Sequence, residues 1–364
     1  ADELRAGTQY LQEHGIRPVV LERVVPEKSG CAFYARLAGN LLSSKPYSVQ
    51  IHSSPELRTA VREAIAARTV DLFHVEWTPY ADCLQHVCNV PWIVMAHNIE
   101  SLIWRRYCES ESGWARRWYI ARQWHKFERF ERKVFAATTR LVTVSQQDAQ
   151  LARGEFGAAR VDVVDNGVDI EFFQPAAVQR EPTRLLFLGS LDWRPNQDAV
   201  SILLDQVFPA IAAVVPTAQL DIVGRNPPDW LVQRVAASAH VTIHANVPDV
   251  RPYLHHAGLM VVPLRIGGGS RLKILEALAA GCPVVSTRVG AEGLDLTPGV
   301  HFTQVAEPAD LPHAILDAFT HPQDAQTLAT AGRQQVVQLY AWDRLADRMN
   351  RVWQDARIPV SPYP

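Results

Sequence analysis

Short apolar runs alternate along this chain with longer stretches in which apolar residues recur every three to four positions. The runs are typical of strands buried on both faces, and the longer stretches are typical of amphipathic helices. In the first half of the chain the pattern predicts helices over 1–14 and 53–67, and strands over 16–21, 72–75, 92–96 and 140–144. In the second half it predicts strands over 185–188, 219–223, 241–243 and 259–264, and a helix over 198–214.

This alternation favours parallel sheets with helices on both faces, and 364 residues exceed what one hydrophobic core usually organises. We therefore expect an α/β fold of two doubly wound domains. A polar, proline-containing stretch separates the two series and predicts domains over 1–172 and 184–340, with a linker over 173–183. The last segment, 341–364, contains a further amphipathic helix. Because the first series opens inside a helix, we also expect a strand and a loop to precede it.

The composition is that of an ordinary globular protein, with 48% hydrophobic and 20% charged residues and a formal net charge of −2. This charge argues against a nucleic-acid partner. No apolar stretch approaches the roughly 20 residues of a membrane-spanning helix, and the start does not resemble a secretory signal, so we expect a cytoplasmic protein. The cysteines form no C-x-x-C pair, and neither D-x-D nor H-E-x-x-H occurs, so no metal site is predicted.

The segment 267–276 carries the chemistry of a phosphate site. Three glycines, Gly267 to Gly269, follow the strand at 259–264 and open a helix, so backbone N–H groups and the positive helix end converge there. The carboxyl end of a strand is also where open α/β sheets bind ligands. The helix then carries two cations and one carboxylate, at Arg271, Lys273 and Glu276. A glycine-rich turn beside a solvated charged face is the alternative, but the combination favours a bound diphosphate.

This segment resembles the signature of the retaining GT-B glycosyltransferases of glycosyltransferase family four, particularly the bacterial branch that acts on exopolysaccharides and related glycoconjugates. The usual form of the signature is E-x7-E, with a glycine-containing loop between the glutamates. Glu276 matches the second glutamate, which in the family holds the nucleotide ribose. Gly268 stands at the place of the first glutamate, so that carboxylate's contact with the donor sugar does not carry over.

The resemblance covers nearly the whole chain and implies two Rossmann-like doubly wound domains that face a central cleft, with the last helix crossing back to the first domain. It implies transfer of a sugar from a nucleoside-diphosphate sugar to an acceptor hydroxyl, with retention of configuration and with neither a metal nor another cofactor. The second domain then binds the donor. The donor contacts that the resemblance implies are Gly189, Ser190, Arg194, Arg225, Val247, Asp249, Gly267, Gly268, Gly269, Ser270, Leu272 and Glu276.

The loop 189–196 looks like the G-x-x-x-W-x-P-N loop of this branch. Ser190 and Pro195 stand where many relatives carry an arginine and a lysine that bind the diphosphate. We therefore expect Arg271 and Lys273 to stabilise the leaving group, with Arg194 as a further candidate.

Two more loops of the second domain border the expected nucleobase. One contains Arg225, and the other is 247–250. Asp249 in the second loop also suits the cap of the helix that follows, and the two roles are compatible.

In the first domain, His97, Asn98 and Glu100 follow an apolar strand on the side of the expected cleft. His97 matches the active-site histidine of the family, which contacts the donor sugar near the reacting centre; a structural histidine is the alternative. Asn98 and Glu100 are expected to touch the acceptor, and Glu100 equally suits a helix cap. The acceptor itself stays open between a saccharide, a small molecule and a lipid-linked compound.

The region 104–133 is rich in aromatic and basic residues, with nine Lys or Arg against four Glu. Aromatic and apolar residues recur there at near-helical spacing, from Trp114 and Trp118 to Phe127, so we expect one face to pack while the arginines face outward. Such a helix suits an anionic membrane or a lipid-linked acceptor. A solvated basic face over a packed aromatic stripe is the alternative, so peripheral contact with the inner face of the membrane is an expectation.

Two other functions remain open beside the transferase. One is a GT-B relative that hydrolyses or epimerises a nucleotide sugar, and the other is a nucleotide-sugar-binding protein that has lost catalysis. No carboxylate nucleophile can be nominated from the sequence, so we expect front-face attack, in which the departing phosphate helps to deprotonate the acceptor.

Overall fold

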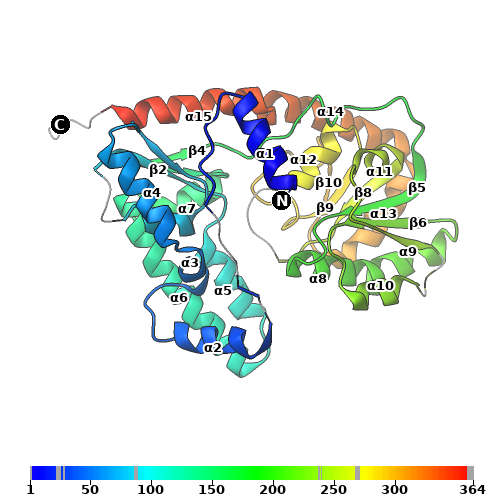
Figure 1. The fold of residues 1–364 in the computed structure, drawn as a ribbon. Coiled ribbons are helices and arrows are strands. Elements are labelled where there is room, and N and C mark those ends of the chain that lie inside the picture. Colours follow the sequence, from blue (N-terminus) through cyan, green and yellow to red (C-terminus); the bar gives the residue numbers. More distant parts are fainter. Residues whose placement is uncertain are drawn as a thin grey trace.

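The computed structural model describes residues 2–21, 26–27, 29–85, 89–236, 238, 240–266 and 271–358. They form two lobes, each built around a parallel sheet, and the lobes are joined along one side by the last two helices (Figure 1). The predicted fold class, two doubly wound α/β domains, is therefore confirmed.

The sheet of the first lobe has the order β1-β2-β3-β4, and all its pairs are parallel. Its strands are β1 (Phe73–Val75), β2 (Trp92–Ala96), β3 (Arg140–Thr143) and β4 (Val161–Val163). The strand predicted over 16–21 is wrong, because these residues form no strand and are not part of the sheet. An apolar run becomes a strand only when a neighbouring strand satisfies its backbone groups.

The sheet of the second lobe has the order β10-β9-β8-β5-β6-β7 and is also parallel throughout. Its strands are β5 (Glu181–Leu188), β6 (Gln219–Gly224), β7 (Val241–Ala245), β8 (Ala257–Val262), β9 (Val284–Thr287) and β10 (Thr303–Val305). The chain runs outward from β5 to β7, then returns to the other side of β5 to form β8. The strand order therefore reverses between β5 and β8, and ligands of open α/β sheets bind at such a switch point.

Helices cover both sheets. Those of the first lobe are α1 (Asp2–Glu13), α2 (Gly30–Asn40), α3 (Tyr47–His52), α4 (Pro55–Ala66), η1 (Thr78–Cys83), α5 (Glu100–Ser110), α6 (Trp114–Ala137) and α7 (Gln146–Phe156). Those that follow are α8 (Arg194–Ile202), η2 (Leu203–Val207), α9 (Phe208–Val214), α10 (Asp229–Ala236), α11 (Arg251–His256), α12 (Leu272–Ala279), η3 (Pro308–Asp310), α13 (Leu311–Thr320), α14 (Pro322–Tyr340) and α15 (Trp342–Arg357).

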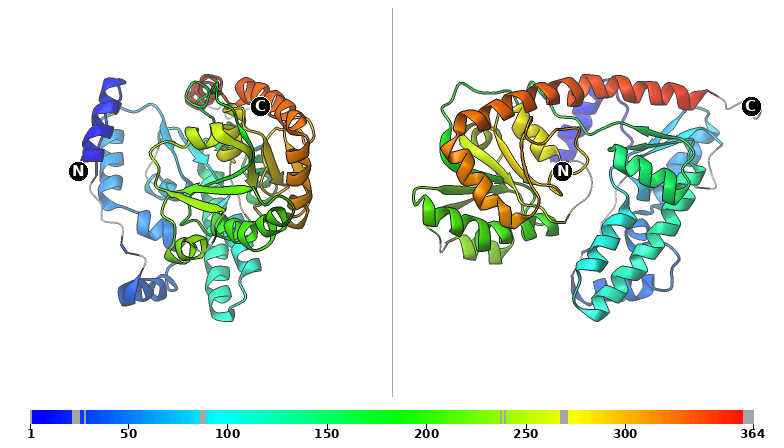
Figure 2. Two further views of the ribbon diagram at one scale, coloured as in Figure 1. Left: turned by 90° about the vertical axis from the view of Figure 1, so that its right-hand side faces the viewer. Right: turned by 180° about the vertical axis from the view of Figure 1, so that it is seen from behind.

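The last helix, α15, closes one face of the first sheet (Figure 2). Because successive residues of a strand point to opposite faces, Ile93 and Met95 of β2 pack with Leu345 of α15, whereas Trp92 and Val94 pack with the core on the α6 side. The chain crosses between lobes at a glycine next to this contact. A Cβ atom on Gly167 would lie 2.7 Å from the Leu345 side chain, so only glycine allows this approach.

The helix predicted over 198–214 begins earlier, at Arg194, and continues through a π-helical turn, η2, to Val214. By length and composition this run of 21 residues is able to cross a membrane. Several of its apolar side chains, including Ala199, Leu203 and Ile211, are instead buried in the core of the second lobe.

Candidate active site

The loop after β5 is held against α12 at the switch point. A Cβ atom on Gly189 would lie 2.8 Å from Asn196 Nδ2 and 3.0 Å from Lys273 Nζ, so a larger residue there would displace both side chains. A Cβ atom on Gly224, at the end of β6, would overlap the carbonyl oxygen of Gly189. The glycines therefore allow the loops after β5 and β6 and the ammonium group of Lys273 to meet within a few ångströms.

Lys273 lies in the first turn of α12 and points back to this meeting point. Its Nζ donates a hydrogen bond of 2.9 Å to Asn196 Oδ1 and lies 4.9 Å from the centre of the Phe187 ring. Burial, and then the nearby charge of Arg271, lower the pKa of Lys273 to about 7. Among the described residues no carboxylate forms an ion pair with Nζ, so this cation lies ready for an anionic ligand.

The side chain of Arg271 has protein partners of its own in this structure. It is the N-cap residue of α12, and its Nη2 donates to the carbonyl of Val289 at 3.0 Å and lies 3.8 Å from Glu292. Glu292 also accepts hydrogen bonds from two residues of the first lobe, Arg106 at 3.3 Å and Gln147 at 3.2 Å. Arg271 thus belongs to a charge cluster between the lobes, and its guanidinium does not join Lys273.

The other predicted contacts of this segment are Glu276, Leu272 and the residues 267–270. Glu276 lies one turn beyond Lys273, and burial raises the pKa of its carboxyl. Among the described residues, none forms a hydrogen bond with that carboxyl. Leu272 opens α12 and is 37% exposed. The predicted contacts Gly267, Gly268, Gly269 and Ser270 lie outside the described residues.

Ser190 and Arg194 are engaged elsewhere. The Ser190 hydroxyl donates to Asp192 at 2.7 Å, and its carbonyl accepts from Asn196 at 2.8 Å, so this residue shapes the loop. Arg194 begins α8 and reaches toward the first lobe, where its guanidinium lies 5.6 Å from the centre of the Tyr107 ring. In this arrangement Arg194 is a contact between the lobes.

The loops after β6 and β7 are tied to one another. Asn226 and Asn246 both have left-handed backbones, with φ of 53° and 54°, and the backbone N–H of Asn226 donates to Asn246 Oδ1 at 3.0 Å. Arg225 is exposed, and Val247 is half-buried. Asp249 accepts hydrogen bonds from the backbone and the guanidinium of Arg251, at 2.9 and 2.8 Å, and this partner lowers the pKa of Asp249. The carboxylate of Asp249 thus fixes the start of α11.

In the first lobe, three polar residues meet at the carboxyl ends of the strands. His97 follows β2, and its Nε2 lies 3.0 Å from Oε2 of Glu76, which follows β1. The hydrogen bond to Glu76 raises the pKa of His97, and Asn166, which follows β4, adds to this effect. The same hydrogen bond lowers the pKa of Glu76. His97 is thereby biased toward its charged form at the edge of the first sheet.

Glu100 is placed by a buried network. Its carboxyl accepts a hydrogen bond of 2.8 Å from Trp77 Nε1, and burial raises its pKa. The side chain of Glu100 caps no described helix; Glu131 of α6 does so for α5, because its carboxyl oxygens accept the backbone N–H groups of Glu100 and Ser101 at 2.6 and 3.1 Å. Asn98, which follows His97 in the chain, is half-buried.

The expected packing of the aromatic stripe on α6 is only partly correct. Phe127 is fully buried, but Trp114 and Trp118 are 85% and 50% exposed. The first turns of α6 extend beyond the core of the lobe, so their aromatic side chains lack a surface to pack on (Figure 1).

Two family models match separate parts of this chain. The model described as "Glycosyltransferase Family 4" matches residues 8–172, and the one described as "Glycosyl transferases group 1" matches residues 182–321. Together they cover most of both lobes, including His97 on the first lobe and Lys273 on the second. The chain belongs to the GT4-type glycosyltransferases of GT-B fold.

Curated relatives of this GT4 chain include sugar transferases of actinobacteria. It is 26% identical over 261 residues to the MMP alpha-(1->4)-mannosyltransferase of Mycolicibacterium hassiacum, covering 68% of this chain and 62% of the relative. It is 28% identical over 213 residues to the glycogen synthase of Mycobacterium tuberculosis, covering 55% of this chain and 50% of that protein. The GT4 chain thus spans half to about three fifths of the length of these relatives.

Solved structures show the same fold. The sucrose-phosphate synthase of Thermosynechococcus elongatus has a TM-score of 0.68 at 22% identity, over 83% of this chain and 77% of that one. HepE of Anabaena, solved in complex with UDP, has a TM-score of 0.67 at 15% identity, over 96% of this chain and 89% of that one. Both likenesses establish the GT-B fold.

The sequence pattern assigned no role in this GT4 site to three residues. Glu76 and Asn166 follow strands on the same edge as His97, and Asn196 holds Lys273. Glu76 carries the same signal as His97, a polar residue directly after an apolar strand. Asn196 was visible only as part of the W-x-P-N loop. In the described part of the chain, no three His, Cys, Asp or Glu side chains gather as a candidate metal site.

Proposed function

We propose that this GT4 protein transfers a sugar from a nucleoside-diphosphate sugar to an acceptor hydroxyl, with retention of configuration. The observation that carries the proposal is the meeting of the Lys273 ammonium, the Gly189 backbone and the N-terminus of α12 at the switch point of the second sheet. A partly buried cation without a carboxylate partner, beside a helix N-terminus, suits a diphosphate. The donor domain is then 184–340, and the acceptor domain is 1–172.

In this proposal each lobe has its own task. Lys273 holds the diphosphate, the segment 267–270 supplies backbone N–H groups, and Glu276 accepts hydrogen bonds from the ribose hydroxyls. Arg225 and Val247 border the base. On the opposite side, His97 contacts the sugar, and Glu76 keeps its ring oriented and charged.

The proposed reaction is a front-face displacement. The bond between the anomeric carbon and the β-phosphate oxygen breaks, and the acceptor oxygen bonds to the same face of that carbon. The proton of the acceptor hydroxyl passes to a phosphate oxygen of the leaving nucleotide. Lys273 and the helix N-terminus stabilise the negative charge that develops there, so the proposal includes no divalent cation. Turnover that EDTA abolishes and Mg²⁺ restores would contradict this part.

The decisive experiment is a product assay guided by nucleotide binding. UDP, GDP, ADP, CMP and dTDP are first screened for an increase in the unfolding midpoint, because a ligand of the native state stabilises it by mass action. The relatives named as mannosyltransferase and glycogen synthase make GDP-mannose and UDP-glucose the first donors to test. Acceptor-dependent release of nucleotide with a glycosylated product supports the proposal. Release without an acceptor indicates a hydrolase, and an altered free sugar nucleotide indicates an epimerase.

A binding protein without catalysis remains the competing candidate. It predicts a thermal shift with a nucleotide but no product with any donor. If turnover is found, His97→Ala is expected to abolish it while the thermal shift with the nucleoside diphosphate persists, since His97 lies on the other lobe from Lys273.

We also propose that the protein works in the cytoplasm, at the inner face of a membrane, through the basic region 104–133, and that its acceptor is a saccharide or a lipid-linked compound. The support is the charge of this region and the exposure of Trp114 and Trp118. Cell fractionation tests it: recovery entirely in the soluble fraction at low salt would contradict the membrane contact.

A further inference from the structure

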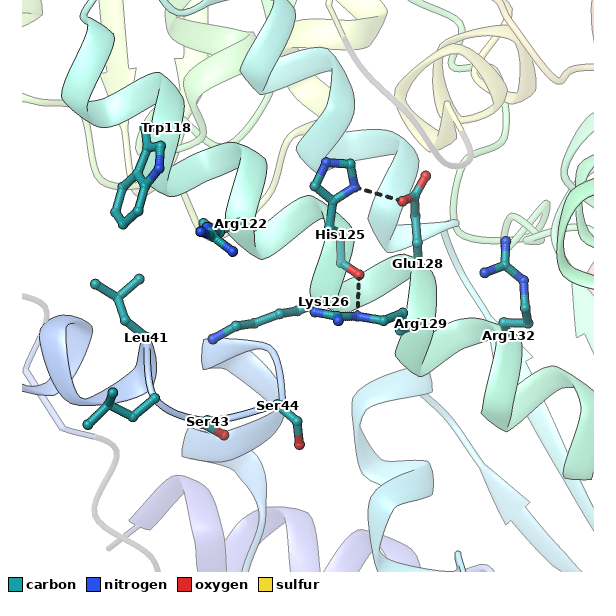
Figure 3. A pocket seen from close by; sticks show the side chains of 11 residues that line it. Leu41, Ser43, Ser44, Trp118, Arg122, His125, Lys126, Glu128, Arg129 and Arg132 are labelled. Carbon is teal, nitrogen blue, oxygen red and sulfur yellow. Dashed lines mark hydrogen bonds and ion pairs between the residues drawn. The ribbon is translucent and has the colours of Figure 1, made fainter.

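A cavity of about 710 Å³ lies on the first lobe between α6 and the loop that follows α2 (Figure 3). Leu41, Leu42, Ser43 and Ser44 of this loop line one wall, and side chains of α6 line the other. None of these residues belongs to the donor site.

The wall formed by α6 is strongly basic. Arg122, Lys126, Arg129 and Arg132 follow one another at intervals of three or four residues, so they share one face of the helix. Among the described residues none of the four forms an ion pair, and Glu128, the acidic residue in the lining, lies 3.0 Å from His125. The helix therefore bears a row of like charges, which weakens a helix unless an anion compensates them.

The opposite wall is held in place by buried polar contacts. Lys126 Nζ donates 2.6 Å to the carbonyl of Asn40, the last residue of α2, and Gln123 donates 2.9 Å to the Asn40 side chain. Both Asn40 and Gln123 are fully buried. The loop 41–44 is thus fixed beside α6 in the free protein, and the cavity is preformed.

The positive surface continues into a second cavity of about 510 Å³, which shares Ser44 and Arg129 with the first. It adds Arg58, Arg62 and Lys133. Asp82 is the acidic residue that lines it, and it is engaged by Arg58 and Lys45. The two cavities together form a basic groove with a capacity for more than one phosphate.

The rim of the basic groove is apolar. Leu42 is 95% exposed and Trp118 is 50% exposed, and Trp114, 85% exposed, lies one turn before Trp118 on α6. The Arg122 guanidinium lies 5.4 Å from the centre of the Trp118 ring, so charge and aromatic surface are adjacent. Tryptophan and leucine beside arginine are the side chains that bind at the headgroup level of a membrane, whereas a soluble anion needs no apolar rim.

We propose that the basic groove binds the phosphate headgroups of anionic lipids, with Leu42, Trp114 and Trp118 inserted at the membrane surface. This rests on the proposed membrane contact and deepens it, because it names the lipid class and adds the loop 41–44 to the contact. The groove lies on a different part of the chain from Lys273, so lipid and nucleotide bind independently.

The test is sedimentation of the full chain with vesicles of phosphatidylcholine alone or with about one third phosphatidylglycerol, at low and high salt. The wild-type protein is expected to bind only the anionic vesicles and to be released by salt. The double variant Arg122→Glu/Arg129→Glu is expected to partition at least about tenfold more weakly, since each basic residue near the surface adds to binding. The milder Arg122→Gln/Arg129→Gln is measured beside it in case charge reversal prevents folding.

The matched control is Arg344→Glu/Arg351→Glu, which changes net charge equally at two exposed positions of α15. It is expected to bind anionic vesicles like the wild type. A loss of binding equal to that of the groove variant would show that only total charge matters and would overturn the proposed lipid site. Leu42→Ser/Trp118→Ser is expected to weaken binding at high salt as well. If inorganic phosphate stabilises the protein but anionic vesicles do not bind, the groove is a soluble-anion site and the proposal is wrong.

Nucleotide binding separates this result from the proposed activity. Every groove variant is expected to keep the wild-type thermal shift with UDP or GDP. A chain that binds vesicles through the groove but transfers no sugar would refute the transferase and leave the lipid site standing.

Discussion

Binding of a diphosphate to Lys273 is expected to take up a proton at alkaline pH. Burial holds the pKa of this lysine at about 7, against the ordinary 10.5, because the loss of water outweighs the attraction of the nearby Glu276 carboxyl, and no described carboxylate forms an ion pair with the ammonium. The difference disfavours the charged form by about 5 kcal/mol, an upper value for a side chain that is partly exposed. Two phosphate charges beside Nζ reverse this preference and return the pKa toward its ordinary value.

The sign of the effect follows from where the proton resides. At pH 6 the ammonium is already charged in the free protein, so binding takes up almost no proton. At pH 8.5 only about 3% of free protein carries it, so binding takes up roughly one proton and the affinity is roughly 30-fold lower. Without ligand, the unfolded state binds more protons than the native state between pH 7 and about 10, so the free protein gains stability as pH rises through that range.

Titration calorimetry with UDP or GDP, in two buffers of different ionisation enthalpy, measures this proton. The terminal phosphate of the nucleotide titrates near pH 6, so the wild type is compared with Lys273→Arg. Arginine stays charged at both pH values and is expected to bind without the additional uptake. If both proteins take up the same number of protons at pH 8.5, Lys273 does not meet the diphosphate and the reasoning fails.

Three further results are expected. Glu76→Gln removes the hydrogen bond that raises the pKa of His97, so the titration of the His97 ring signals by NMR is expected to shift to lower pH. The pair stabilises the fold at pH values at which Glu76 is ionised and His97 is charged. This contribution, at most about 1 kcal/mol, is lost as pH rises through the pKa of His97. Burial raises the pKa of Glu131 to about 8, so wild-type stability is expected to fall relative to Glu131→Gln as pH rises from about 4.5 to 8, by up to about 5 kcal/mol in thermal or urea unfolding. Arg106→Met removes a contact between the lobes to Glu292 and is expected to broaden the distance distribution in small-angle X-ray scattering while unfolding changes by less than about 1 kcal/mol.

Each of these has a contrary outcome. An unchanged His97 titration would mean that Glu76 does not orient the ring. A stability difference for Glu131→Gln that is constant with pH would show that burial does not raise the pKa of this carboxyl. For the contact between the lobes, Arg105→Met is the matched control, because Arg105 pairs with Glu109 of its own helix. An equal broadening in both variants would assign the effect to α5 rather than to Glu292.

The sequence pattern predicted those parts of the site that depend on local physics. Runs such as 92–96 and 185–188 are strands because both faces of a parallel sheet are buried, and His97 and Gly189 follow them at the carboxyl ends. It failed for 16–21, where a strand needs a partner that lies elsewhere in the chain. It also gave Glu76 and Asn166 no role at the site, because their approach to His97 depends on how the four strands β1 to β4 align side by side.

By itself, the sequence determined most of the strands of the two sheets, the two-domain α/β class, and the position of the helix α12 with its cations. These features follow from hydrophobic period and from the backbone freedom of glycine, which are local properties. Only the tertiary structure decided where the long side chains point: Lys273 toward Gly189 and Asn196, Arg271 toward Glu292, and the arginines of α6 into a groove with the loop 41–44. A long cationic side chain adopts the direction in which its charge keeps the most favourable combination of hydration and oppositely charged or hydrogen-bonding partners. Those partners come together only when distant segments of the chain pack against one another.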